Sequence, residues 1–205
     1  MLSLSKHAGQ TDARTERALS PWNPFRRRDD EVDAAPLYAA VVAQARRPAF
    51  YLAAGVPDSL DGRFELIALH LYLVLHRLKR GGEGEAALAQ ATVDAFTADM
   101  DASLREMGAG DLGVGKRVQR MAAGFYGRVG AYDAAGDGPA LTDALRRNLY
   151  GTVAAGAGQL AVMADYLARA QAMLAGQATA DLSAGRPRFP DPSAFPWRGP
   201  GTAPA

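Results

Sequence analysis

The sequence lacks cysteine entirely, so disulfide bonds, thiolate metal ligands and cysteine nucleophiles are excluded. It also lacks an excess of charge of one sign: the formal net charge of the 205 residues is +1, which gives no overall field for nucleic acid. The longest apolar run, residues 66–75, is interrupted by His70 and is too short to span a bilayer. The first 31 residues lack the apolar core and cleavage site of a secretory signal. These absences predict a compact soluble domain.

Segments typical of β-strands are also missing. No run shows the alternating or β-branched pattern of a strand, whereas the good helix formers Ala, Leu, Arg and Met are frequent. Pro36 and Pro139 each stand where a first helical turn tolerates proline. The segment from Phe64 to Leu75 is apolar on nearly all sides, which predicts a buried central helix. We therefore predict an all-α domain, a single compact bundle of about six or seven helices, over residues 35–178.

The two ends of the chain have a different composition. Residues 1–34 are polar and without a steady period, which predicts a disordered N-terminal arm. Residues 179–205 are dense in proline, which cannot continue a helix or a central strand. For this segment we predict a disordered, extended, Pro-rich C-terminal tail.

One stretch, GAGDLGVGKR at residues 108–117, resembles a phosphate-binding loop. Such a loop needs a strand before it, and here the preceding residues predict a helix. Arg117 also stands where a Ser or Thr should meet magnesium. A charged, exposed connection between two helices is the better interpretation, and exposed loops on a rigid scaffold often carry binding residues. A phosphate- or nucleotide-binding enzyme is therefore a distant third hypothesis, behind the two binding functions described below.

The helix predicted from Lys116 to Ala135 carries three glycines, at residues 124, 127 and 130. Each costs about 1 kcal/mol relative to Ala in a helix interior, so a compensating reason is expected. A close helix crossing inside the bundle is the commoner reason and the one we favour. The alternative is a shallow groove for an apolar partner helix. Phe125, Tyr126 and Tyr132 can line such a groove or belong to the core.

Metal and catalytic sites are not predicted. His70 and His76 are six residues apart on one helix, which does not match the four-residue spacing of a metal pair. Asp99 and Asp101 point apart on a helix, which argues against paired acid–base work.

The segment VPDSLDGR, residues 56–63, is given a structural role instead. Asp58 or Ser59 is expected to cap a helix. Asp61 and Arg63 are expected to pair with the RRN segment of another helix. The members of this predicted polar network are Asp58, Asp61, Arg63, Arg146, Arg147 and Asn148.

Three segments together resemble the ubiquinol–cytochrome c chaperone family. They are FYLAAGVPDSLDGRFELIALHLYLVLHRLK (residues 50–79), DMDASLREMGAGDLGVGKRVQRMAAGFYGRVGAYDAA (residues 99–135) and LRRNLYG (residues 145–151). The resemblance spans roughly residues 38–152, in the order and spacing of the family. The departures are modest and lie in the glycine-rich segment near Ala109, Gly113 and Gly115.

What this resemblance implies is an assembly chaperone of the cytochrome bc1 complex (ubiquinol–cytochrome c reductase) that binds newly made cytochrome b. The implied protein is not an enzyme and has no cofactor, metal or small-molecule substrate. In a bacterium it would lie in the cytoplasm or at the periphery of the inner membrane, and in a eukaryote in the mitochondrial matrix or at the inner membrane. Mitochondrial members work near the ribosome with a small partner protein.

The predicted client surface combines the charged segment with part of the glycine-bearing helix. Its candidate residues are Arg105, Glu106, Asp111, Lys116, Arg117, Arg120, Phe125, Tyr126, Gly127 and Arg128. The alternative hypothesis is a scaffold that docks on a membrane surface or a ribosome through basic residues, because phosphate contacts give affinity without sequence readout.

Overall fold

The computed structural model describes residues 32–106, 111–136 and 138–197, with the backbone alone for residues 111–114. The all-α prediction is confirmed: these residues form helices and no strand. Six helices have ten or more residues: α1 (Ala35–Ala45), α3 (Leu60–Leu78), α4 (Glu83–Glu106), α5 (Asp111–Ala135), α6 (Pro139–Asn148) and α7 (Ala157–Ala175). Shorter elements are α2 (Pro48–Leu52), α8 (Thr179–Ser183) and a 3-10 turn, η1 (Pro192–Ala194).

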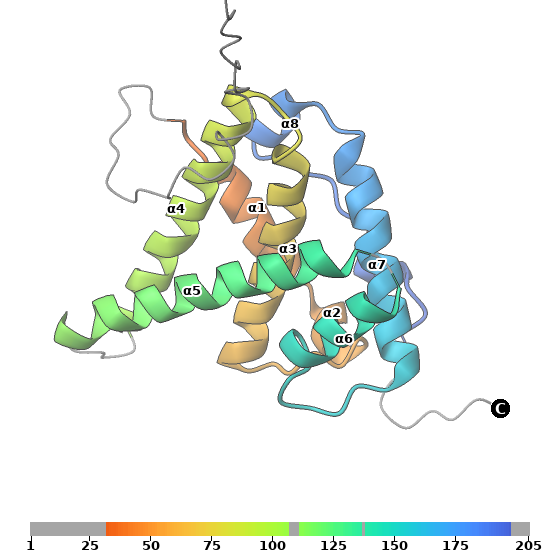
Figure 1. The fold of residues 1–205 in the computed structure, drawn as a ribbon. Coiled ribbons are helices and arrows are strands. Elements are labelled where there is room, and N and C mark those ends of the chain that lie inside the picture. Colours follow the sequence, from red (N-terminus) through yellow and green to blue (C-terminus); the bar gives the residue numbers. More distant parts are fainter. Residues whose placement is uncertain (1–31, 107–110, 137, 198–205) are drawn as a thin grey trace, which may run out of the picture. The chain divides into compact units, whose positions relative to one another are not determined.

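Helix α3 is the centre of the bundle, as its all-round apolar sequence predicted. It contacts α1, α4, α5 and α7, and α5 crosses it at a steep angle (Figure 1). Every residue from Glu65 to Val74 is buried. Ser59 caps the start of the helix: its Oγ accepts a hydrogen bond from the Gly62 amide (3.2 Å), and this confirms the predicted cap.

His70 of α3 joins three elements through the core. The side chain is fully buried, with Nδ1 2.8 Å from the Leu66 carbonyl and Nε2 2.8 Å from the Tyr166 hydroxyl. Because a carbonyl can only accept, Nδ1 carries the proton and the tyrosine donates to Nε2. The same hydroxyl accepts from Gln44 of α1 (3.0 Å). Burial lowers the pKa of His70 to about 4, so the ring is neutral.

The C-terminal segment differs from the prediction. Residues 179–197, expected within a disordered tail, pack on the domain: Leu182 is fully buried, and Phe195 is 9% exposed. Residues 186–191, which include two prolines, form no helix, yet the aromatic residues Phe189, Phe195 and Trp197 pack against α2, α3 and α7. Phe189 packs on His70, with ring centroids 5.4 Å apart. Trp197 lies against both Phe50 and Phe195.

Polar contacts fix the same segment. Gln177 accepts from the Arg188 amide (2.9 Å) and donates to the Arg188 carbonyl (3.0 Å), as a neighbouring strand would. Asp191 pairs with Arg47 at the start of α2 (2.8 Å). The ordered domain therefore continues past residue 178, because proline excludes regular structure but not packing. At the other end it includes Val32 and the buried Ala34, and the predicted arm before residue 32 lies outside the described residues.

Candidate functional site

Helices α4 and α5 meet at one corner of the domain (Figure 1), and the charged connection predicted for residues 108–117 extends into α5. The structure corrects the extent of this loop. Helix α4 continues to Glu106 and α5 begins at Asp111, so Lys116 is already in the second turn of a helix. A helix therefore leads into this segment, as predicted, and the strand that a phosphate loop requires is not there.

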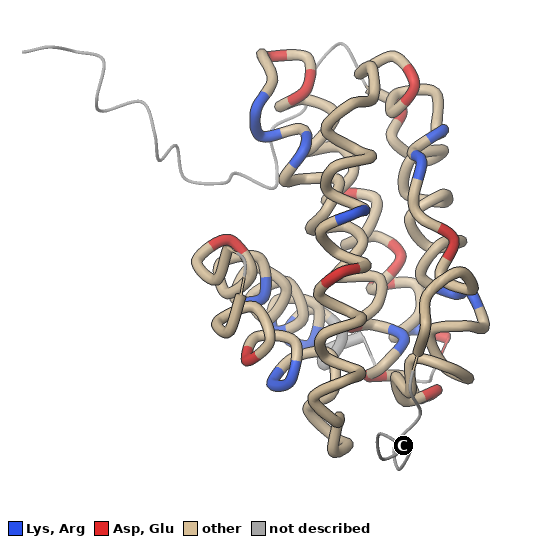
Figure 2. Tube along the Cα trace, turned by 90° about the vertical axis from the view of Figure 1, so that its right-hand side faces the viewer, with Lys and Arg blue, Asp and Glu red and all other residues tan. Residues whose placement is uncertain are grey.

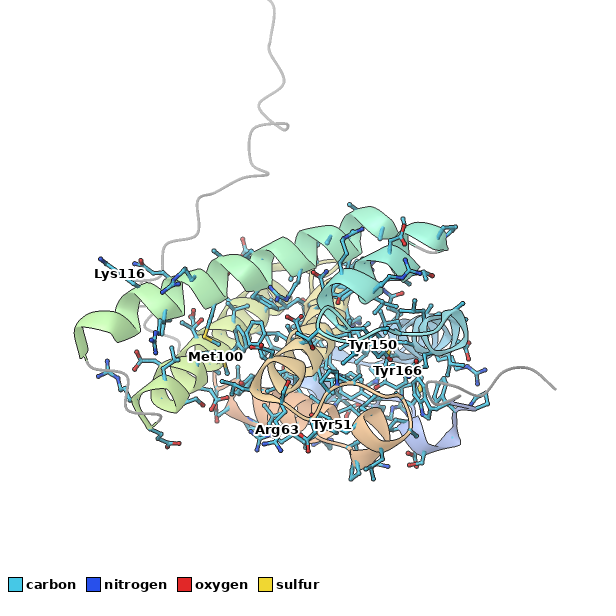
Figure 3. The ribbon with its side chains drawn as sticks, turned by 90° about the horizontal axis from the view of Figure 1, so that it is seen from below. Tyr51, Arg63, Met100, Lys116, Tyr150 and Tyr166 are labelled. Carbon is cyan, nitrogen blue, oxygen red and sulfur yellow. The ribbon has the colours of Figure 1, made fainter. Side chains whose placement is uncertain are left out.

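Three basic side chains are exposed on the first half of α5: Lys116, Arg117 and Arg120, named here the basic row. Within the described part of the chain none of them forms an ion pair, and Arg120 donates only to the Lys116 carbonyl of its own helix (3.4 Å). Lys116 lies at the end of the domain remote from Tyr150 and Tyr166 (Figure 3). Figure 2 shows α5 nearly end-on at the left, with more basic than acidic positions along it.

The other charged candidates at this corner differ from the basic row. Arg105 pairs with Asp101 one turn earlier on α4, with Nε and Oδ2 2.6 Å apart. Glu106 is exposed at the end of the same helix. The side chain of Asp111 lies outside the described residues.

The aromatic candidates of α5 separate into core and surface. Phe125 is 1% exposed and packs on Phe96 of α4, with ring centroids 5.1 Å apart, so it is a core residue rather than part of an accessible surface. Tyr132 is equally buried, against Tyr72. Tyr126 is 41% exposed and lies beside Phe125, so it is the aromatic side chain of α5 that a partner can reach.

The glycines of α5 do not mark a helix crossing, which corrects the explanation we favoured from the sequence. A Cβ on Gly127 or Gly130 would meet no atom within 4 Å. At Gly124 a Cβ would lie 3.0 Å from Nη1 of Arg128, whose side chain folds back along the helix. Gly124 thus makes room for the side chain of Arg128. Gly127 and Gly130, together with Ala123 one turn earlier, leave that part of the outer face of α5 without large side chains.

Arg128 is held by an acidic residue that the sequence analysis did not single out. Its Nε donates to Oε2 of Glu65 on α3 (2.6 Å), Nη2 donates to Oε1, and Nη1 donates to the Gly124 carbonyl (2.9 Å). Its guanidinium also lies over the Phe64 ring, 5.2 Å from the centroid. Burial raises the pKa of Glu65, and Arg128 opposes that shift. Arg128 therefore ties α5 to α3. The sequence feature that could have predicted this pair is Glu65, a single acidic residue next to the apolar run of α3.

The predicted polar network between VPDSLDGR and RRN takes another form. Arg63 donates to Asp58 (2.7 Å), and this partner holds the pKa of Asp58 below its usual range. Arg146 bonds Asp143 within α6. Each arginine thus pairs inside its own segment, and the expected tie from Arg63 across to α6 is wrong. Arg147 is exposed at the end of α6.

Within residues 32–106, 111–136 and 138–197, no group of three or more His, Asp or Glu side chains could hold a metal ion. His76 contacts Asp133, which also bonds Lys79 (2.9 Å), on the surface between α3 and α5. No helix in the described part of the chain is both long and apolar enough to cross a membrane.

Two comparisons with known proteins agree with this architecture. The family model described as ubiquinol-cytochrome C chaperone matches residues 52–189, two thirds of the chain. The chain belongs to this family. The crystal structure of the Cbp3 homologue from Brucella abortus superposes with a TM-score of 0.71 at 38% sequence identity, covering 79% of this chain and 91% of that one. No curated protein matches. The family match ends at residue 189 and so includes most of the C-terminal segment that packs on the domain.

Proposed function

We propose that this protein is a non-enzymatic assembly chaperone of the cytochrome bc1 complex and that its client is newly made cytochrome b. Membership of the ubiquinol–cytochrome c chaperone family carries this proposal. The likeness to the Brucella Cbp3 homologue, over nine tenths of that chain, supports it. On this proposal the protein works in the cytoplasm or at the inner membrane, covering apolar surface of an unfinished membrane subunit by hydrophobic burial steered by charge.

The client surface that we propose is the outer face of α5, centred on Tyr126 and Gly127. Tyr126 is a large apolar side chain with a polar tip, the residue type that dominates protein interfaces. Next to it, Gly127 and Gly130 allow the backbone of a partner helix to approach closely, since nothing lies within 4 Å of their Cβ positions. Arg128 contributes by holding α5 on α3. By helical spacing, Lys116 and Arg120 of the basic row lie on the same side of α5 as Gly127.

Site-specific photo-crosslinking in the native host tests this proposal, with a photoreactive residue in place of Tyr126. Met173 of α7 provides the matched control, because it is 40% exposed against 41% for Tyr126. We expect cytochrome b to be crosslinked from position 126 and not from position 173. Crosslinks to cytochrome b from neither position, or equally from both, would contradict the proposed surface.

A further inference from the structure

The basic row breaks the usual rules for charge on a helix. Lys116 and Arg120 are four residues apart, and Arg117 and Arg120 three, so each pair places like charges on neighbouring positions. The row occupies the second and third turns of α5, and the one acidic residue before it in this helix, Asp111, starts the first turn. A local conflict of this kind, without a compensating contact, is expected at functional sites.

Contacts that would relieve the conflict are missing from the described part of the chain. All three side chains are exposed and none pairs with a carboxylate there. Basic residues elsewhere are often paired within their own segment: Arg105 with Asp101, Arg146 with Asp143 and Arg169 with Asp165. The basic row thus presents three unneutralised charges together at one end of the domain (Figure 3).

We infer that the basic row binds the phosphate groups of an anionic lipid surface. This inference rests on the proposed function, because a chaperone of a membrane subunit meets its client where lipid headgroups are close. The positive charge of the row complements the negative surface potential of such a membrane, and each cation near the surface strengthens binding about fivefold. Docked through the row, α5 would present Tyr126 and its glycine face beside the bilayer.

Lipid is favoured over RNA by the size of the row. Sequence-independent binding of an RNA strand uses a basic groove with aromatic platforms along several nucleotides. The basic row covers residues 116–120, little more than one helical turn, and the next exposed aromatic side chain of α5 is Tyr126. Lipid headgroups need no continuous groove, because each is bound separately.

Vesicle co-sedimentation of the full chain tests the inference. We expect binding to vesicles of phosphatidylglycerol and phosphatidylcholine, weaker at high salt, and no binding to phosphatidylcholine alone. The K116Q/R117Q/R120Q variant should bind the anionic vesicles about 100-fold more weakly, from fivefold for each of three cations. Its melting temperature should not fall, because the variant removes repulsion between like charges and only one long, exposed hydrogen bond within the helix.

The matched control removes three exposed cations elsewhere that also lack an ion pair among the described residues: R80Q/R147Q/R188Q. It should retain most vesicle binding. Equal losses in the two triple variants would overturn the inference, and so would full binding by K116Q/R117Q/R120Q. Tighter binding of the wild type to poly(U) RNA than to anionic vesicles at the same salt, lost in K116Q/R117Q/R120Q, would assign the row to nucleic acid instead.

Failure of this inference can be told apart from failure of the proposed function. If the vesicle assay fails while position 126 still crosslinks to cytochrome b, the lipid inference is wrong and the chaperone proposal stands. If vesicles bind through the basic row and no crosslink to cytochrome b forms, the proposed client is wrong.

Discussion

At the residue scale, His70 couples the stability of the fold to pH. Its pKa is lowered by burial to about 4 in the folded chain, against 6.5 for an unperturbed histidine, so the unfolded chain binds more protons between these values. Stability from the neutral ring is therefore fully present above pH 6.5 and is lost as pH falls towards 4. We expect the His70 contribution to lower the free energy of unfolding by about 2 kcal/mol when the pH is lowered from 7 to 5.

Urea unfolding at a series of pH values measures this effect. The His70→Asn variant keeps a polar group near Nδ1 but cannot be protonated, so its stability should change less over the same range. Parallel pH profiles for the wild type and the variant would contradict a neutral, buried His70.

The glycines of α5 allow a second test on single residues. Gly127→Ala and Gly130→Ala should each raise the free energy of unfolding by about 1 kcal/mol, because alanine favours the helix and the added Cβ meets nothing. Gly124→Ala should gain less or lose, since its Cβ would press on the Arg128 guanidinium at 3.0 Å. Thermal unfolding of the three variants gives the comparison. A loss of stability at position 127 or 130 would mean that this face is packed after all.

The same variants link stability to function. If Gly127 is kept small for the client, Gly127→Ala should stabilise the chain and still reduce crosslinking to cytochrome b from Tyr126. A stabilised variant with unchanged crosslinking would show that the client does not approach this position closely.

At the scale of elements, one buried ion pair fixes α5 on the central helix. The Glu65 side chain is 9% exposed and that of Arg128 25%, so removal of either leaves the other partly buried without its counter-charge. We expect Glu65→Leu and Arg128→Leu each to lower the free energy of unfolding by about 2 kcal/mol. The double variant should lose clearly less than the two single losses together. A strictly additive double-mutant cycle, measured by denaturant unfolding, would contradict the tie.

The C-terminal segment gives another prediction about elements. A chain that ends at residue 178 lacks Leu182, Phe189, Phe195 and Trp197 and uncovers the aromatic face around His70. We expect it to be less stable by at least about 3 kcal/mol, the cost of deleting one large core side chain. A chain that ends at residue 197 is the control and should melt like the full chain. Equal melting of the two shortened chains would contradict a structural role for residues 179–197.

At the scale of the whole molecule, local sequence signals predicted the helices better than their contacts. The apolar run of α3 and the prolines at the starts of α1 and α6 specify helices through neighbours in sequence. The pairing of Arg128 with Glu65 joins residues 63 positions apart, and the packing of Phe189 on His70 joins residues farther apart still. No spacing rule predicts such contacts, because they depend on which helix faces meet.

For the candidate site too, the sequence indicated the helix that carries it but not the contacts of its side chains. Charge and glycine content drew attention to α5, and its exposed face does carry the basic row, Tyr126 and Gly127. The sequence could not show which of Phe125 and Tyr126 is buried. Neighbouring residues on a helix point in different directions, and which direction faces the core depends on how the helix packs against the others. It likewise could not show that Gly124 serves Arg128 while Gly127 serves no contact within the described domain.

The most direct test of the account is the paired crosslinking experiment in the native host, with photoreactive probes at Tyr126 on α5 and at the equally exposed Met173 on α7. A chaperone that uses the outer face of α5 predicts crosslinked cytochrome b from position 126 alone. Cytochrome b crosslinked only from position 173, or an unrelated protein as the main product at position 126, would contradict it.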